Sequence, residues 1–175
     1  MVSTEVNIGE RNKEFKTPLI ASLIGIAIFV FIPFFYWEER IIYSYDYSFY
    51  PFGLMGRSFH FLESPGEILP IMYFLLGVLI FLIITAVYSY VIYSSRDSIK
   101  EEYIKLLHIG SLIATIGIIV CTIITALVII DHINKGQTPW NGSSYCCTTF
   151  FLPVNGVFIW IIPYFNARFF SRFLS

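Results

Sequence analysis

Four long apolar segments limit what this chain can fold into. None of them carries Asp, Glu, Lys or Arg in its interior, and they cover residues 18–37, 68–93, 106–130 and 150–166. A helix rises 1.5 Å per residue, so about 20 apolar residues cross a hydrocarbon core of roughly 30 Å. The hydrophobic share of 57% and the charged share of 13% also differ from those of a soluble globular protein. The sequence therefore predicts an all-α transmembrane fold, in which residues 1–175 form a single four-helix bundle in contact with membrane lipid.

The distribution of basic residues predicts the orientation of this bundle. Eight of the eleven Lys and Arg residues lie in the N-terminal arm, the middle loop and the C-terminal tail, which four spans place on one side. Basic residues accumulate on the cytoplasmic side of membrane proteins. Both termini are thus expected to be cytoplasmic, and loops 38–67 and 131–149 to be outside. The net charge of −1 gives no basic field for nucleic acid, so we exclude that partner.

The first outer loop has the pattern of a β-hairpin. Residues 41–50 place aromatic side chains at every second position, residues 51–53 contain Pro and Gly, and residues 54–61 read as a second strand. A lone hairpin is marginal in water, so it must lean on the helix ends below it, on the last loop or on a partner protein, which would cover its aromatic face. The predicted partner-binding residues are Tyr43, Tyr45, Tyr47, Phe49, Gly53 and Leu54.

The same loop carries a partial motif. Trp37 is followed by "FGLMG", which contains Gly53 and Leu54. With four spans and a strand-forming first outer loop, the chain resembles the claudin and peripheral myelin protein class. That class continues its Gly-Leu step with Trp and adds two cysteines, whereas here Met55 follows Leu54 and the first loop has no Cys. The resemblance implies a non-enzymatic protein that adheres to a neighbour or modulates a larger complex through its first outer loop.

The third apolar segment contains a stripe of small residues at spacings of three or four. In lipid, small side chains let helix backbones approach closely, which is a main source of helix association. The stripe is expected to be either a seam inside the bundle or a surface for a second membrane protein. Its members are Gly110, Ala114, Gly117, Cys121 and Thr125.

The second outer loop carries two candidate modification sites. The triplet that begins at Asn141 is an N-glycosylation sequon, and the predicted topology places it outside. Cys146 and Cys147 are adjacent in the same loop. They can bond to each other in a strained ring, bond to another chain, or remain free.

The fourth apolar segment is interrupted by Pro153, by the pair Asn155 and Gly156, and by Pro163. A Pro inside a helix removes a hydrogen bond and bends it. The segment is expected to be a kinked helix, or else a discontinuous helix that lines a small-molecule site.

No enzyme chemistry is visible in the sequence. We identify no catalytic residue, cofactor site or metal site, because no nucleophile and base pair, phosphate loop or metal-ligand motif is present. The only ionisable side chain within a predicted span is His108, near its inner end. Two functions remain, both through protein contact: a claudin-like adhesion or auxiliary role, or an accessory subunit of a larger membrane complex such as a respiratory complex. The expected partners are other membrane subunits or further copies of this chain.

Overall fold

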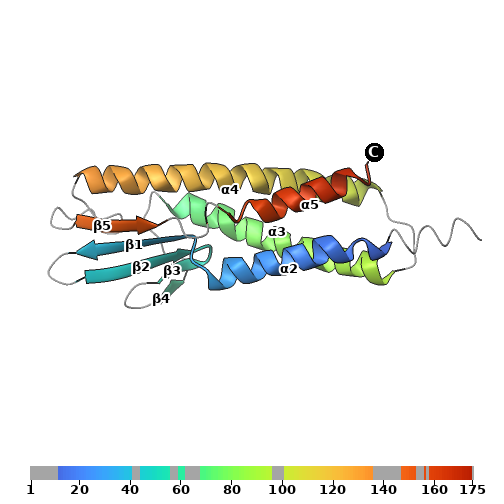
Figure 1. Cartoon of the computed structure of the whole chain (residues 1–175), viewed down its shortest axis with the longest axis horizontal. Coiled ribbons are helices and arrows are strands. Elements are labelled where there is room, and N and C mark those ends of the chain that lie inside the picture. The colour runs from blue at the N-terminus through green and yellow to red at the C-terminus, as the bar shows by residue number, and fades with distance from the viewer. Residues whose placement is uncertain are drawn as a thin grey trace, which may run out of the picture.

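The computed structural model describes residues 12–40, 44–55, 59–61, 68–95, 101–135, 147–152, 156 and 158–174. These residues form a mostly helical fold with a sheet at one end (Figure 1). The helices are α2 (Lys16–Phe31), α3 (Leu69–Ser94), α4 (Glu101–Lys135) and α5 (Ile161–Ser171). The strands are β1 (Phe35–Arg40), β2 (Ser44–Tyr50), β3 (Gly53–Met55), β4 (Phe59–Phe61) and β5 (Cys147–Leu152).

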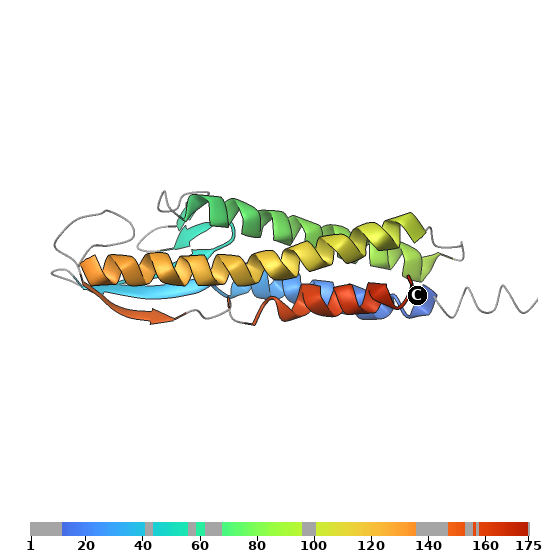
Figure 2. The ribbon, with the colours of Figure 1, turned by 90° about the horizontal axis from the view of Figure 1, so that it is seen from above.

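The helices lie lengthwise beside one another, and the sheet continues beyond the ends of α2 and α5 (Figure 1). Helix α4 runs along both parts, so that its second half lies next to the sheet (Figure 2). The described chain begins at residue 12 and stops at residue 174, both at the end of the bundle opposite the sheet. We call this end the inner end and the sheet end the outer end.

The sheet is larger than the predicted hairpin. It is antiparallel, with the order β4-β3-β2-β1-β5. The second predicted strand, 54–61, is divided into β3 and β4, which pair with each other. Strand β1 is added from the end of the first apolar segment, and β5 from the second outer loop and the start of the fourth segment. Three or more strands with a covered face are stable where a hairpin is not, which explains the larger sheet.

The first apolar segment is only partly helical. Helix α2 ends at Phe31, and Ile32 is extended with φ −113° and ψ 126°. Residue 33 is Pro, whose ring disfavours the helical conformation of the residue before it. The chain therefore leaves the helix at this point and enters β1 two residues later.

The fourth apolar segment is not one kinked helix, contrary to the favoured expectation. It contributes the end of β5, and helix begins only at Ile161. Pro163 is the third residue of α5, in the first turn, where a missing N–H breaks no helical bond. The interruptions at 153 and 155 lie outside the described residues.

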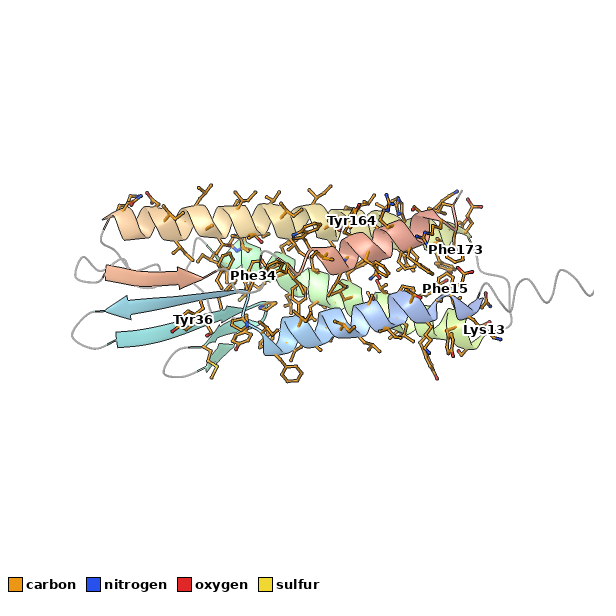
Figure 3. The ribbon with its side chains drawn as sticks, viewed as in Figure 1. Lys13, Phe15, Phe34, Tyr36, Tyr164 and Phe173 are labelled. Carbon is orange, nitrogen blue, oxygen red and sulfur yellow. The ribbon has the colours of Figure 1, made fainter. Side chains whose placement is uncertain are left out.

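Two groups of buried side chains hold the fold together. The outer group joins the helices to the base of the sheet and includes Phe34, Phe35 and Phe49. The inner group centres on Phe15, which lies 5.4 Å from Phe169 and 4.9 Å from Phe173 between ring centroids. Figure 3 shows Phe15 and Phe173 together at the inner end. Aromatic contacts of this kind each add about 0.5–1.5 kcal/mol beyond their buried area.

The bundle buries several polar side chains beside its apolar core, and its exterior is also apolar. Its fully or nearly fully buried side chains include Ser22, Thr85, Ser89, Ser111, Thr115, Thr125 and Asn166. The large side chains on its exterior are Ile, Leu, Val, Phe and Tyr on every helix, for example Leu23, Val87, Ile116 and Phe165. A soluble helical protein instead has charged and polar side chains on its exterior.

Candidate functional site: the outer sheet, its junction with the helices, and the helix seam

A chain of hydrogen bonds fixes the sheet to the bundle. The backbone N–H of Phe34 donates to the carbonyl oxygen of Phe49 at 2.6 Å, and that of Gly156 donates to the carbonyl oxygen of Phe34 at 3.3 Å. The Thr122 hydroxyl lies 2.8 Å from the carbonyl oxygens of both Gly156 and Ile118, so that its one hydrogen is shared between them. Segments next to α2 and α5 are thereby joined to α4 at one point. A Cβ at position 156 would lie 3.2 Å from the Thr122 hydroxyl oxygen, so glycine allows this close approach.

Removing the Thr122 hydroxyl tests this junction. We expect Thr122→Val to lower the free energy of unfolding by about 1 kcal/mol, because a carbonyl of the buried Gly156 loses its donor while side-chain size is kept. Thermal unfolding in detergent measures the change. Thr115→Val is the control: its hydroxyl bonds only within α4, to the carbonyl oxygen of Ser111, so an equally large loss there would show that the link to Gly156 adds nothing.

Phe49 belongs to the protein core. Its Cα pairs with that of Phe35 across β1 and β2, and both side chains are fully buried. Aromatic cross-strand pairs are among the main stabilising contacts of antiparallel sheets. The prediction that Phe49 forms part of a partner surface is therefore wrong for this residue: the helices below the sheet cover it.

Four of the other predicted contact residues lie on β2, the strand of Phe49, and on the neighbouring β3. Tyr45 and Tyr47 are in β2, paired through the backbone with Glu39 and Trp37 of β1. Gly53 and Leu54 are in β3, where Leu54 is opposite Phe49. The structure thus brings the predicted motif and the aromatic strand next to each other. Tyr43 lies outside the described residues.

The two candidate modification sites are mostly beyond what the structure describes. Asn141 and Cys146 lie outside the described residues. Cys147 is the first residue of β5, with its backbone opposite Arg40 of β1. The sequence analysis had left β5 unrecognised, although "CTTFFL" has the β-branched and aromatic content of a strand.

The small-residue stripe of α4 faces the interior of the bundle. Ala114, Cys121 and Thr125 are buried, and Gly110 and Gly117 are half-buried. A Cβ added to Gly117 would overlap the ring of Phe74, and one added to Gly110 would overlap the ring of Phe81. Two phenylalanines of α3 thus occupy the space left by two glycines of α4.

These contacts repeat at seven-residue steps in opposite directions along the two antiparallel helices. Phe74 lies against Gly117 and Phe81 against Gly110; one step further, Tyr88 and Tyr103 have ring centroids 5.2 Å apart. A seven-residue period keeps the same face of a helix towards its neighbour. We name the contacts of Phe74 and Phe81 with Gly117 and Gly110 the α3–α4 seam. The glycine side of this seam was predicted from the sequence, and the phenylalanine side was not.

Polar contacts tie α5 to its neighbours. The side-chain amide of Asn166 donates to the Ser22 hydroxyl of α2 at 3.0 Å, and both side chains are fully buried. The His108 ring nitrogen Nδ1 lies 2.9 Å from the Ala167 carbonyl oxygen. A carbonyl only accepts, so Nδ1 carries the hydrogen and His108 acts as a link between α4 and α5.

One ion pair at the inner end is exposed to solvent. Lys105 Nζ lies 2.7 Å from a Glu101 carboxylate oxygen on the first turns of α4. The hydrogen bond and the charge of Lys105 lower the pKa of Glu101, and the same pair raises the pKa of Lys105. In the part of the chain that the structure describes, no group of three His, Cys, Asp or Glu side chains could hold a metal ion. The geometry described here offers surfaces for contact.

No protein-family model matches the chain, and neither a curated protein nor a solved structure shows significant similarity to it.

Proposed function

We propose that this chain is a non-enzymatic integral membrane protein that crosses the bilayer four times and acts by protein contact through its outer sheet. This is the role that the resemblance to the claudin and peripheral myelin protein class implies. The observation that carries the proposal is the apolar exterior of the bundle, which also buries polar side chains and is joined to a sheet at one end.

The apolar exterior supports immersion in lipid. Side chains such as Ile116 and Leu127 of α4 are 62% and 61% exposed, whereas Ser111 and Thr125 of the same helix are fully buried. In water, exposing so much apolar surface costs roughly 25 cal/mol for each Å². In lipid the cost vanishes, and buried hydroxyl groups such as those of Thr85 and Thr125 donate to carbonyl oxygens of their own helices.

The lengths of the two long helices are consistent with a bilayer. Helices α3 and α4 are long and apolar enough to cross a membrane. At 1.5 Å per residue they extend about 39 Å and 52 Å, against a hydrocarbon core of about 30 Å. Helices α2 and α5 have 16 and 11 residues, about 24 Å and 17 Å, and are shorter than the hydrocarbon core.

The charges support an orientation with the sheet outside the cell. Exposed basic side chains gather at the inner end of the bundle, at the inner ends of α2, α4 and α5: Lys13, Lys16, Lys105, Arg168 and Arg172. Positive charge is enriched on the cytoplasmic side. The inner end then faces the cytoplasm, and the sheet faces the neighbouring cell or membrane.

The contact role is tested by removing aromatic side chains from β2. Tyr45 and Tyr47 share a face of β2 with Phe49 but lie further from the ends of α2 and α5 along the strand. We expect Tyr45→Ser with Tyr47→Ser to leave the melting temperature unchanged and to reduce capture of a differently tagged copy more than tenfold, because interface tyrosines are frequent hot spots. Mixing two cell populations, each of which expresses one of the two tagged copies, tests for contact between apposed membranes. Co-precipitation from one population measures contact within a membrane.

The matched control is Tyr73→Ser with Tyr90→Ser, the same chemical change at two exposed positions on α3. A fall in melting temperature for the β2 variant would mean that the two tyrosines pack on their own chain. If neither stability nor capture changes, the sheet is not the contact surface, and the proposal fails.

A further inference from the structure

A cleft lies between the start of α2 and the end of α5. Both of these are at the inner end of the bundle (Figure 1). Its volume is about 190 Å³, far above the roughly 15 Å³ that one water molecule needs. It is lined by Glu14, Thr17, Phe165, Arg168, Phe169 and Arg172. None of these side chains has a part in the sheet or in the α3–α4 seam.

The lining changes from apolar to basic along α5. Phe165 is 45% exposed at the end of the cleft nearer the middle of the bundle, and Phe169 is buried and packs against Phe15. Arg168 and Arg172 are exposed and follow in the direction of the inner end. Seven residues separate Phe165 from Arg172, which corresponds to about 10 Å along the helix. One end of the cleft is therefore apolar and the other end is charged. The distance between the two ends is similar to the depth of a lipid headgroup region.

The mouth is electropositive. Two guanidinium groups oppose one carboxylate, that of Glu14, so the formal charge of the lining is +1. Guanidinium groups bind phosphate through paired, charge-assisted hydrogen bonds. The Thr17 hydroxyl adds a further donor on the α2 side.

We infer that this cleft binds an anionic glycerophospholipid of the cytoplasmic leaflet. Its phosphate lies at Arg168 and Arg172, and the start of an acyl chain lies along Phe165. The inference rests on the proposed membrane insertion. In a bilayer, one lipid molecule can contact the apolar wall of the cleft with its acyl chain and the basic mouth with its headgroup. A free phosphate ion satisfies the arginines and leaves Phe165 without a contact.

Lipid competition on the purified full-length protein tests the inference. In mild detergent, we expect phosphatidylglycerol to bind more tightly than phosphatidylcholine and to raise the melting temperature, with native mass spectrometry counting the bound lipids. Arg168→Gln with Arg172→Gln should weaken phosphatidylglycerol binding about 100-fold, at roughly tenfold for each charge-assisted contact. Glu14→Gln should strengthen it about fivefold, since one opposing charge is removed.

The matched control is Lys13→Gln with Lys16→Gln, which removes the same charge from neighbouring exposed positions that do not line the cleft. An equal loss in this variant would show diffuse attraction and overturn the inference. It is also overturned if phosphatidylcholine binds as well as phosphatidylglycerol, or if inorganic phosphate or glycerol phosphate stabilises the protein as much. Retention in pure phosphatidylcholine vesicles after an alkaline wash checks membrane insertion separately. Loss of retention would defeat the proposed function, whereas retention without lipid preference would defeat this inference alone.

Discussion

Gly117→Leu is expected to lower the free energy of unfolding by about 3 kcal/mol, at the upper end of what overpacking costs. Even a single Cβ at this position overlaps the ring of Phe74, which occupies the space beside the glycine. A leucine therefore forces α3 and α4 apart or drives Phe74 out of the seam. Unfolding in a denaturing detergent, followed by circular dichroism, measures the loss.

Gly77→Leu supplies the matched control for this change. Gly77 is on α3, and a Cβ there meets no atom within 4 Å. The same substitution should leave stability within about 0.5 kcal/mol of the original, as is usual at exposed positions. A partial rescue of Gly117→Leu by Phe74→Ala would show that the two side chains share one space. Equal losses at positions 77 and 117, without rescue, would contradict the α3–α4 seam.

Phe49→Ala is expected to cost about 3–5 kcal/mol, the range for removing a fully buried aromatic ring. The ring lies in the outer group of buried side chains with Phe34 and Phe35, between the sheet and the helices. Its loss leaves a cavity at the point where the two parts meet. The melting temperature in detergent and the protease sensitivity of the outer loops measure the effect.

The control for Phe49 is Met55→Ala in β3, because Met55 is 51% exposed. It should change stability by less than about 0.5 kcal/mol. If Phe49→Ala keeps full stability, the sheet is not anchored through this ring, and the assignment of Phe49 to the core is wrong.

The positions of the two long helices could be predicted from the sequence because uncharged apolar runs of this length have few alternative structures. Residues 68–93 and 106–130 correspond to α3 and α4, with ends that differ by a few residues. The same signal failed at the first and fourth segments. A run of apolar residues has the same hydropathy in a buried strand as in a membrane helix. Pro33 indicated locally that α2 stops early, but Pro33 alone did not show that a strand of the sheet follows.

The candidate contact site was only partly predictable. Alternation in 41–50 indicated a strand, and β2 is found there, but alternation does not tell which aromatic side chains the helices cover. Phe49 proved to be buried because it packs with Phe34, Phe35 and residues of the helices, a contact that alternation within one strand does not reveal. The glycine side of the seam was visible as a stripe of small residues. Phe74 and Phe81 were not, because α3 is apolar on all sides.

The proposed function requires that the sheet lies outside the membrane and that the inner end lies in the cytoplasm. Site-directed labelling tests both positions at once. In a background with the three native cysteines replaced, Met55→Cys in β3 and Lys13→Cys at the inner end each present one exposed thiol. The account predicts that a membrane-impermeant maleimide labels position 55 in intact cells and position 13 only after the membrane is opened. Labelling of both positions in intact cells, or of position 13 alone, would contradict it.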